Sequence, residues 1–513
     1  MSTPLFERRF GRRGFLKVSA ALAAASLAPA GVVDVRRALA AGTLRQPGSL
    51  PFPSRPAGVP QPDLAPELAN IDHIIMVMME NHSFDNYFGL LPYHVPALAG
   101  QVDGWPQLDA NGVPTATQVD NNGVTQRAHP MPDGCQPHGV SQSWSSSHRA
   151  YDGGLMDGFL RESSTDAIGY WDETLLPFYY SLASSFPVCD RYFCSTLCQT
   201  YPNRVFSMAA TAAGLVSTDT PPPTVTPANG HIFDVLTAHG IGWADYYSEL
   251  PSPGLFGAAW AASQQGTHLF GPFGSPEATI AAFAAACNGG TLPPVVMVET
   301  DYQWGSEENP QNIQVGQTFV AGVVNALMSS PAWATSLLIF TYDEHGGYYD
   351  HVSPPAALNP GDGSHPNIAT TYGDDYTRYG FRVPTVIVSP WARSGFTSHT
   401  VYDHTSWLAT IERKFNLPAL TLRDANANPL DDCLVSSGPA PFATPPALAT
   451  APLRTEADSI ACEQNGSDPI PSSGAPEAPL TPLLAGAAAV GGAAAIALRR
   501  ARGESRDLPA DVR

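Results

Sequence analysis

The chain has 513 residues, of which 43% are hydrophobic and only 14% are charged, so it can form one large domain or two. Its 46 acidic residues outnumber its 26 basic residues, which gives a formal net charge of -20. This balance argues against a nucleic-acid partner and suits a soluble exported protein.

The first segment, residues 1–40, has the pattern of a twin-arginine signal peptide. Residues 11–17 read "GRRGFLK", an Ala-rich apolar stretch follows over 18–33, and Ala38-Leu39-Ala40 is a small-residue cleavage site. An ordinary N-terminal helix is the alternative, but these features occur in the order of an export signal. We therefore expect the twin-arginine export machinery to carry the folded protein out of the cytoplasm.

The C-terminal segment has the pattern of a membrane anchor. A polar Pro/Ser/Gly linker over 463–479 precedes residues 480–498, which contain no charged side chain, and a basic tail follows over 499–513. A span of this length crosses a bilayer, and the arginines of the tail favour the cytoplasmic side. We expect a protein on the extracellular face of the cell membrane, or a secreted one if the tail is removed.

The central part of the chain has the pattern of an α/β domain. A Pro-rich leader over 41–69 precedes a predicted catalytic domain over 70–462. Short apolar runs typical of buried strands, at 74–79, 295–298, 337–342 and 383–388, alternate with helical patterns such as 315–329 and 406–415. This alternation predicts a central, mostly parallel sheet flanked by helices, with loop insertions, whose ligands gather at the carboxyl ends of the strands.

Two of the predicted strands end in acidic residues. Glu80 and Asn81 follow the first run, and Asp343 and Glu344 follow the run at 337–342. A helix cap or a surface ion pair would explain one such strand end. Carboxylates from two parallel strands would meet at one sheet edge and repel each other unless a cation lay among them. An all-oxygen ligand set of this kind favours Ca²⁺, Mg²⁺ or Mn²⁺.

The stretch "TYPNR" at 200–204 offers a nucleophile. Thr200 precedes a proline and a helical pattern, so its hydroxyl would lie in the positive field of a helix N-terminus. Arg204 could clamp a phosphate oxygen. The alternative is that Thr200 merely caps the helix.

Several histidines could supply a proton to a leaving group, namely His138, His148, His351 and His404. Each of them, taken alone, is more often a structural hydrogen-bonding residue.

Five motifs, in order, resemble those of the bacterial phosphoesterase family: "MMENHSFDNYFG", "TYPNR", "TYDEHGGYYDHVSPP", "RVPTVIVSPWAR" and "YDHTSWLATIERKF". They span residues 78–415. That family contains non-specific phospholipases C and an acid phosphatase, and is related to the alkaline phosphatase superfamily. The resemblance implies an alkaline-phosphatase-like fold.

The resemblance also implies residue roles. It makes Thr200 a metal-bound nucleophile and His138 the active-site histidine, with His148 as the competing candidate. The family usually carries a His-Pro-Pro stretch where this chain has Asn309, which cannot protonate a leaving group. The implied ligands of one divalent cation are Glu80, Asn81, Thr200, Asp343 and Glu344.

The predicted function is an exported, metal-dependent phosphoesterase that works through a phosphothreonine, most simply a phospholipase C that acts on phospholipid headgroups. The alternatives are a phosphomonoesterase of the acid phosphatase type and a non-catalytic surface-binding protein of the same fold. A sulfatase is disfavoured, because threonine at position 200 cannot be oxidised to a formylglycine. The seven cysteines permit disulfides after export, and the odd count leaves at least one thiol without an intramolecular pair.

Overall fold

The structure, a computed structural model, describes residues 44–465 apart from 61, 137–139, 220–221 and 369–371. The compact unit considered below begins at Arg45. The predicted signal peptide, the predicted membrane anchor and the basic tail lie outside the described residues. Within the described part of the chain, no helix is both long enough and apolar enough to cross a membrane.

The unit is built on an eight-stranded sheet with the order β12-β6-β11-β10-β1-β9-β7-β8. Only β11 runs antiparallel to the others, so the predicted α/β fold with a mostly parallel sheet is confirmed. The strands are β1 (His73–Met79), β6 (Val188–Cys189), β7 (Trp243–Tyr247), β8 (Leu269–Phe270), β9 (Val295–Glu299), β10 (Ser336–Tyr342), β11 (Val386–Val388) and β12 (Thr397–Ser398).

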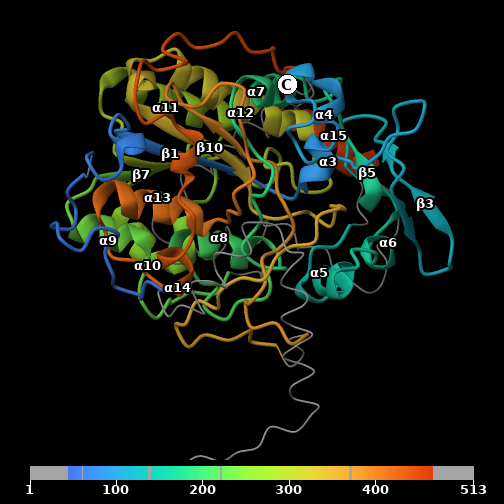
Figure 1. The fold of residues 1–513 in the computed structure, drawn as a ribbon, viewed down its shortest axis with the longest axis horizontal. Helices are drawn as coiled ribbons and strands as arrows, with labels where there is room; N and C mark the ends of the chain where they lie inside the picture. Colours follow the sequence, from blue (N-terminus) through green and yellow to red (C-terminus); the bar gives the residue numbers. More distant parts are fainter. Residues whose placement is uncertain (1–43, 61, 137–139, 220–221, 369–371, 466–513) are drawn as a thin grey trace, which may run out of the picture. The chain divides into compact units, whose positions relative to one another are not determined.

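Helices cover both faces of this sheet (Figure 1). One layer contains α7 (Pro177–Ser185), α11 (Pro276–Gly289) and α12 (Ile313–Met328); the other contains α8 (Thr200–Ala209), α9 (Ile232–Ala238) and α13 (Thr405–Phe415). Because both faces are covered, every residue of β10 and all of β1 except His73 are buried. This burial explains why the two strands read as continuous apolar runs instead of alternating ones.

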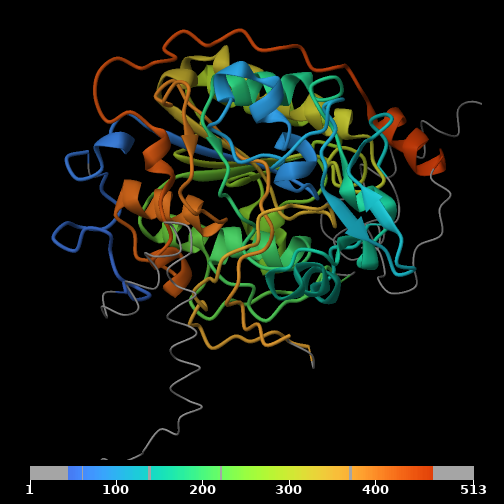
Figure 2. The same ribbon diagram turned by 45° about the vertical axis from the view of Figure 1, so that its right-hand side comes forward.

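The remaining elements surround this core. The hairpin of β2 (Thr117–Val119) and β3 (Thr125–Arg127) projects beside α5 (Trp144–Tyr151) and α6 (Phe159–Glu162), as the turned view shows (Figure 2). β4 (His129–Pro130) pairs with β5 (Gly169–Tyr170). The other α-helices in the described part of the chain are α3 (Phe84–Phe88), α4 (Leu91–His94), α10 (Ala258–Gln264), α14 (Leu422–Ala425) and α15 (Glu456–Asn465).

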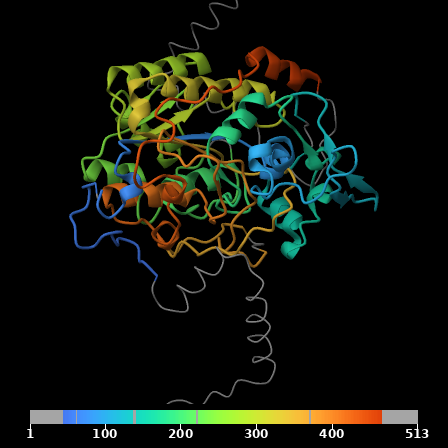
Figure 3. The ribbon, with the colours of Figure 1, turned by 45° about the horizontal axis from the view of Figure 1, so that its top comes forward.

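A disulfide ties the last described helix to the insertion before α5. Cys135 is bonded to Cys462 of α15, 327 residues later, and α15 lies beside α12 (Figure 3). Residues 463–465, the first of the predicted linker, belong to this helix. The other five cysteines are buried and are not in disulfides.

Candidate active site

Carboxylates from neighbouring strands meet at one edge of the sheet. β1 and β10 are paired in register, with Met79 opposite Tyr342, so Glu80 and Asp343 are the next residues on adjacent strands. The Asp343 backbone N–H donates to the Met79 carbonyl at 3.0 Å. Glu80, Asp343 and Glu344 are all buried. The parallel order of the strands thus brings together the acids that the sequence singled out.

Asn81 joins this group in an unusual conformation. Its φ is 70°, in the left-handed region, and its backbone N–H donates to Asp343 Oδ1 at 3.3 Å. Its side-chain amide is fully buried and finds no hydrogen-bond partner among the described residues. A buried polar group left in this state costs about 1–3 kcal/mol, so the amide is suited to a ligand that lies between the strand ends.

The turn after β10 packs tightly against the end of β1. The Gly346 N–H donates to Glu344 Oε2 at 2.8 Å, with φ of +65° at Gly346. A Cβ atom on Gly346 would lie 1.9 Å from the carbonyl oxygen of Asn81. Both the conformation and the space therefore require glycine at this position.

Replacing Gly346 with alanine is expected to displace the Asn81 and Glu344 loops and to lower kcat/KM by about 10²-fold, because misplacement of site groups by about 1 Å has effects of this size. The matched control is Gly363→Ala, since Gly363 also has a positive φ of +81° but has open space around its Cβ position. That variant should carry only the conformational cost, about 1 kcal/mol of stability, with unchanged activity. Steady-state kinetics and thermal unfolding of both variants check this, and equal activities would contradict it.

Arg204 lies among the carboxylates and is 2% exposed. Its Nε donates to Asp343 Oδ2 at 3.1 Å, and its Nη2 lies 3.7 Å from Glu80 Oε1. Its Nη1 donates to Tyr302 Oη at 2.9 Å and lies 3.3 Å from Glu299 Oε1. Burial opposes the charge, but Tyr302 and the carboxylates raise the pKa of Arg204 overall. The described partners of Arg204 are therefore protein groups. The predicted contact of Arg204 with a phosphate oxygen stays a prediction.

Glu299 is a carboxylate at the end of a third strand, and the sequence did not single it out. It is the last residue of β9, next to β1, and it is 2% exposed. Its Oε2 accepts the Ser252 backbone N–H at 2.6 Å, and its Oε1 accepts the hydroxyls of Ser252 and Tyr302. The signal was the one that identified Glu80: an acid directly after a buried apolar run.

Thr200 is the first residue of α8, and the N-cap residue is Gln199. The alternative in which Thr200 merely caps the helix is therefore wrong. Thr200 is buried, and it precedes Arg204 by one helical turn, so both side chains lie on the same face of α8. Asn203 fixes the segment just before α8. Its Nδ2 donates to the Cys198 carbonyl at 2.9 Å, and its Oδ1 accepts the Thr196 N–H at 3.0 Å.

The family model of the Phosphoesterase family matches residues 71–418. This chain belongs to the Phosphoesterase family. It is therefore a hydrolase that acts on phosphate esters.

Curated relatives of the phosphoesterase carry phospholipase names. It is 30% identical to Phospholipase C A of Mycobacterium tuberculosis over 420 residues, which cover 74% of this chain and 79% of the relative. It is 28% identical to Non-specific phospholipase C3 of Arabidopsis thaliana, over 72% of this chain and 74% of the relative. Among solved structures, it is similar to a protein of the alkaline phosphatase superfamily from Vibrio parahaemolyticus, with a TM-score of 0.33, 10% identity, and coverage of 66% of this chain and 77% of that one.

Two buried histidines adjoin the acidic pair of the phosphoesterase. His404 Nε2 lies 2.7 Å from the Asp343 carbonyl, which only accepts, so Nε2 carries the proton and donates. His345 Nδ1 lies 3.0 Å from Glu344 Oε2. Burial lowers the pKa of His404 to about 4 and that of His345 to about 3. Both rings are thus neutral at physiological pH, and the hydrogen bond from His404 supports the strand-end loop.

The other predicted site residues lie as follows. His138 falls outside the described residues. His148 is in α5, where its ring contacts the Trp144 carbonyl at 2.7 Å and Asp374 Oδ2 at 3.1 Å. Asn309 Nδ2 donates to Tyr348 Oη at 2.8 Å. Both residues are therefore held by protein groups.

His351 forms a partly buried ion pair. Its Nδ1 lies 2.6 Å from Asp85 Oδ2 and its Nε2 lies 3.3 Å from Asp103 Oδ1. Although burial opposes protonation, these carboxylates raise the pKa of His351 to about 9. Arg382 holds Asp85 from the other side, at 3.0 Å. The group therefore has the character of a structural ion-pair network.

The raised pKa of His351 predicts a pH-dependent stability. Since the folded value lies above the unfolded value of about 6.5, the ion pair contributes fully below pH 6.5, and its contribution is lost as the pH rises through about 9. We expect about 2 kcal/mol to be lost over this window in wild type and not in His351→Gln. Urea unfolding at pH 6 and 9.5 measures both, and parallel pH dependences of the two proteins would refute the assignment.

The described residues contain two groups of three side chains whose metal-binding atoms lie within 4.8 Å of one another: Asp85, Asp350 and His351, and His94, Asp172 and Glu173. Arg382 already neutralises the first group, donating to Asp350 Oδ1 at 2.9 Å, and the second lies near the surface. Neither contains a predicted ligand. The strand-end group fits a hard divalent cation by its chemistry, because it combines buried carboxylates with the unpartnered amide of Asn81.

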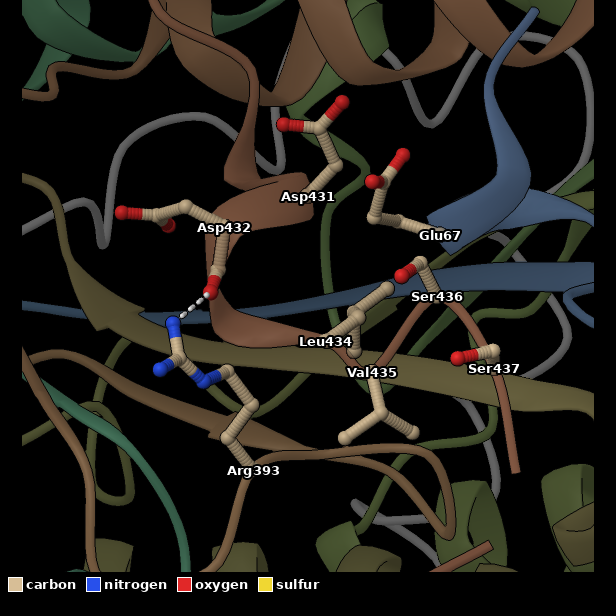
Figure 4. A pocket seen from close by; sticks show the side chains of 8 residues that line it. All are labelled: Glu67, Arg393, Asp431, Asp432, Leu434, Val435, Ser436 and Ser437. Carbon is tan, nitrogen blue, oxygen red and sulfur yellow. Dashed lines mark hydrogen bonds between the residues drawn. The ribbon is translucent and has the colours of Figure 1, made fainter. Parts of the chain in front are cut away.

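A separate pocket of about 420 Å³ contains none of the predicted site residues (Figure 4). Arg393 Nη1 donates to the Asp432 carbonyl at 3.2 Å across its edge. The lining residues are Glu67, Arg393, Asp431, Asp432, Leu434, Val435, Ser436 and Ser437.

Proposed function

We propose that this phosphoesterase is a metal-dependent phospholipase C that acts on phospholipid headgroups through a phosphothreonine intermediate. The observation that carries the proposal is the meeting of Glu80 and Asp343 at one sheet edge beside the unpartnered amide of Asn81. The choice of phospholipid over other phosphate esters is supported by the names of the relatives, which are phospholipases C in bacteria and a plant.

The residues that would hold the metal are those named from the sequence: Glu80, Asn81, Thr200, Asp343 and Glu344. A divalent cation bound there supplies positive charge next to the reacting oxygens and favours the ionised hydroxyl of Thr200. Burial raises the pKa of Asp343, and the Arg204 guanidinium opposes that rise and favours the anionic form that a cation needs.

In the proposed reaction, the Thr200 hydroxyl loses its proton to solvent, and its Oγ attacks phosphorus in line and forms the new P–O bond, while the bond to the diacylglycerol oxygen breaks. The departing oxygen takes a proton from a histidine, for which His138 and His148 are the candidates. Water then attacks the phosphothreonine, which releases the phosphorylated headgroup and restores the hydroxyl. We assign His404 a structural role, because the one hydrogen bond that it donates among the described contacts goes to the Asp343 carbonyl.

The test compares hydrolysis of p-nitrophenylphosphorylcholine, a diester, with that of p-nitrophenyl phosphate, a monoester, by the purified protein. A phospholipase C should give the higher kcat/KM on the diester. The reverse order assigns the site to a phosphomonoesterase. No turnover of either substrate, by wild type and Thr200→Val alike with metal present, assigns it to a non-catalytic binding protein.

We also propose that the protein is exported by the twin-arginine machinery and anchored on the extracellular face of the membrane. The arginine pair Arg12 and Arg13, the cleavage site and the uncharged stretch 480–498 support this location. Cell fractionation tests it. Replacing both arginines with lysine should retain the protein inside the cell, and truncation after residue 479 should release it into the medium, whereas unchanged fractionation of both variants would refute the proposal.

A further inference from the structure

Three adjacent parallel strands, β10, β1 and β9, deliver acids to the same sheet edge, and one guanidinium lies among them. The acids are Asp343, Glu80 and Glu299, and the guanidinium is that of Arg204. Extending the pairing of β1 with β9 places Glu299 beside Met78, two residues before Glu80. Arg204 Nη2 faces the Met78 carbonyl at 3.4 Å, which fixes the guanidinium at the junction of the two strands.

The two sides of the guanidinium have different partners. Its Nε faces the predicted metal ligand Asp343 at 3.1 Å, whereas its Nη1 faces Glu299, Ser252 and Tyr302. The partners of Nη1 therefore lie beside the predicted metal site and not within it. Glu299 is the only acid of this second group that contacts Arg204 among the described residues.

A positive charge among metal ligands opposes the binding of a cation. At a separation of several ångströms and an effective dielectric constant of about 20, one unit charge changes the affinity for a divalent cation by at least about tenfold. Arg204 would weaken metal binding in this way if its charge were not offset. The carboxylate of Glu299, 3.3 Å from Nη1, lies where it offsets that charge.

The position of Glu299 is strongly determined by its surroundings. It is buried, it accepts hydrogen bonds from the Ser252 N–H and from two hydroxyls, and Asp245 of β7 lies behind it. Asp245 is fully buried, and its burial and the neighbouring Glu299 carboxylate raise its pKa. These contacts hold the Glu299 carboxylate beside Arg204 Nη1.

We propose that Glu299 is a positioning residue of the phosphoesterase. It anchors Arg204 through Nη1 and offsets its charge, so that the guanidinium repels a divalent cation at Glu80 and Asp343 less strongly. This inference rests on the proposed metal dependence. Glu299 acts through Arg204 and does not itself hold the metal or touch the substrate.

The test is Mn²⁺ binding to the purified full-length protein, measured by isothermal titration calorimetry and by the rise in Tm on metal addition. Glu299→Gln keeps the size of the side chain and its acceptor for the Ser252 N–H, but removes the charge. We expect its Kd for Mn²⁺ to rise at least about tenfold, with a smaller metal-induced rise in Tm. The matched control is Tyr302→Phe, which removes a hydroxyl from the same guanidinium without changing charge, and its Kd should stay within about threefold of wild type.

A charge-neutral double variant separates the electrostatic role from a merely structural one. Arg204→Gln combined with Glu299→Gln removes both charges, so it should bind Mn²⁺ as tightly as wild type, even if Glu299→Gln alone does not fold. Weaker binding by the double variant, or a Kd for Glu299→Gln within threefold of wild type, overturns the inference. If wild type itself binds no Mn²⁺, Ca²⁺ or Mg²⁺, the proposed metal dependence fails, which is a different and recognisable result.

Discussion

Replacing Thr200 with valine is expected to lower kcat by about 10³-fold or more, because the proposed reaction has no other nucleophile to form the phosphoryl intermediate. Valine has nearly the shape of threonine and lacks only the hydroxyl. Since the N-cap residue of α8 is Gln199, loss of the Thr200 hydroxyl should leave the helix end intact. We therefore expect a change in Tm of only a few degrees, measured by thermal unfolding beside the kinetics.

The matched partner is Thr200→Ser, which keeps a hydroxyl at the same position on the buried face of α8. It should retain turnover within about tenfold of wild type, and rapid acid quenching with a ³²P-labelled substrate should trap the phosphorylated residue in wild type and in the serine variant. A valine variant that turns over at the wild-type rate, or that also traps label, would remove Thr200 from the reaction.

The sequence predicted the features that can be recognised within one continuous strand. β1 and β10 were predictable because both faces of each are buried, so each reads as a continuous apolar run. The meeting of Glu80 with Asp343 followed from the expected parallel order. In contrast, β6 and β12 are two residues long and leave no periodic pattern.

The parts that the sequence did not predict depend on contacts between distant segments. The partners of Arg204 come from three strands and from the segment around Ser252, so no spacing along the chain reveals them. The charge of Arg204 suggested a contact with phosphate, whereas its described partners include the buried carboxylates of Glu80, Glu299 and Asp343. Likewise, no local signal pairs Cys135 with Cys462 across 327 residues. Motifs predicted the candidate site residues, but the contacts among the charged side chains at the sheet edge required the fold.

Removal of divalent metal is expected to abolish turnover and to lower stability together. The acids at the ends of β1 and β10 are buried side by side, so without a cation their repulsion is opposed mainly by Arg204. A cation present at 100 times its Kd would stabilise the folded state by about 2.7 kcal/mol. Dialysis against EDTA should therefore lower the Tm by several degrees and reduce kcat to background, and readdition of Mn²⁺, Ca²⁺ or Mg²⁺ should restore both.

Asp343→Asn provides the matched control for this experiment. Asparagine keeps the size of the side chain and can still accept the Glu344 N–H, which Asp343 Oδ1 accepts at 2.7 Å, but it contributes no charge to a cation. The variant should be inactive before and after readdition of metal, and its Tm should not respond to EDTA. A dialysed wild-type sample that elemental analysis finds free of metal, and that still hydrolyses the diester at full rate, would show that the strand-end acids serve the protein without a cation, with Arg204 as their only counter-charge among the described contacts.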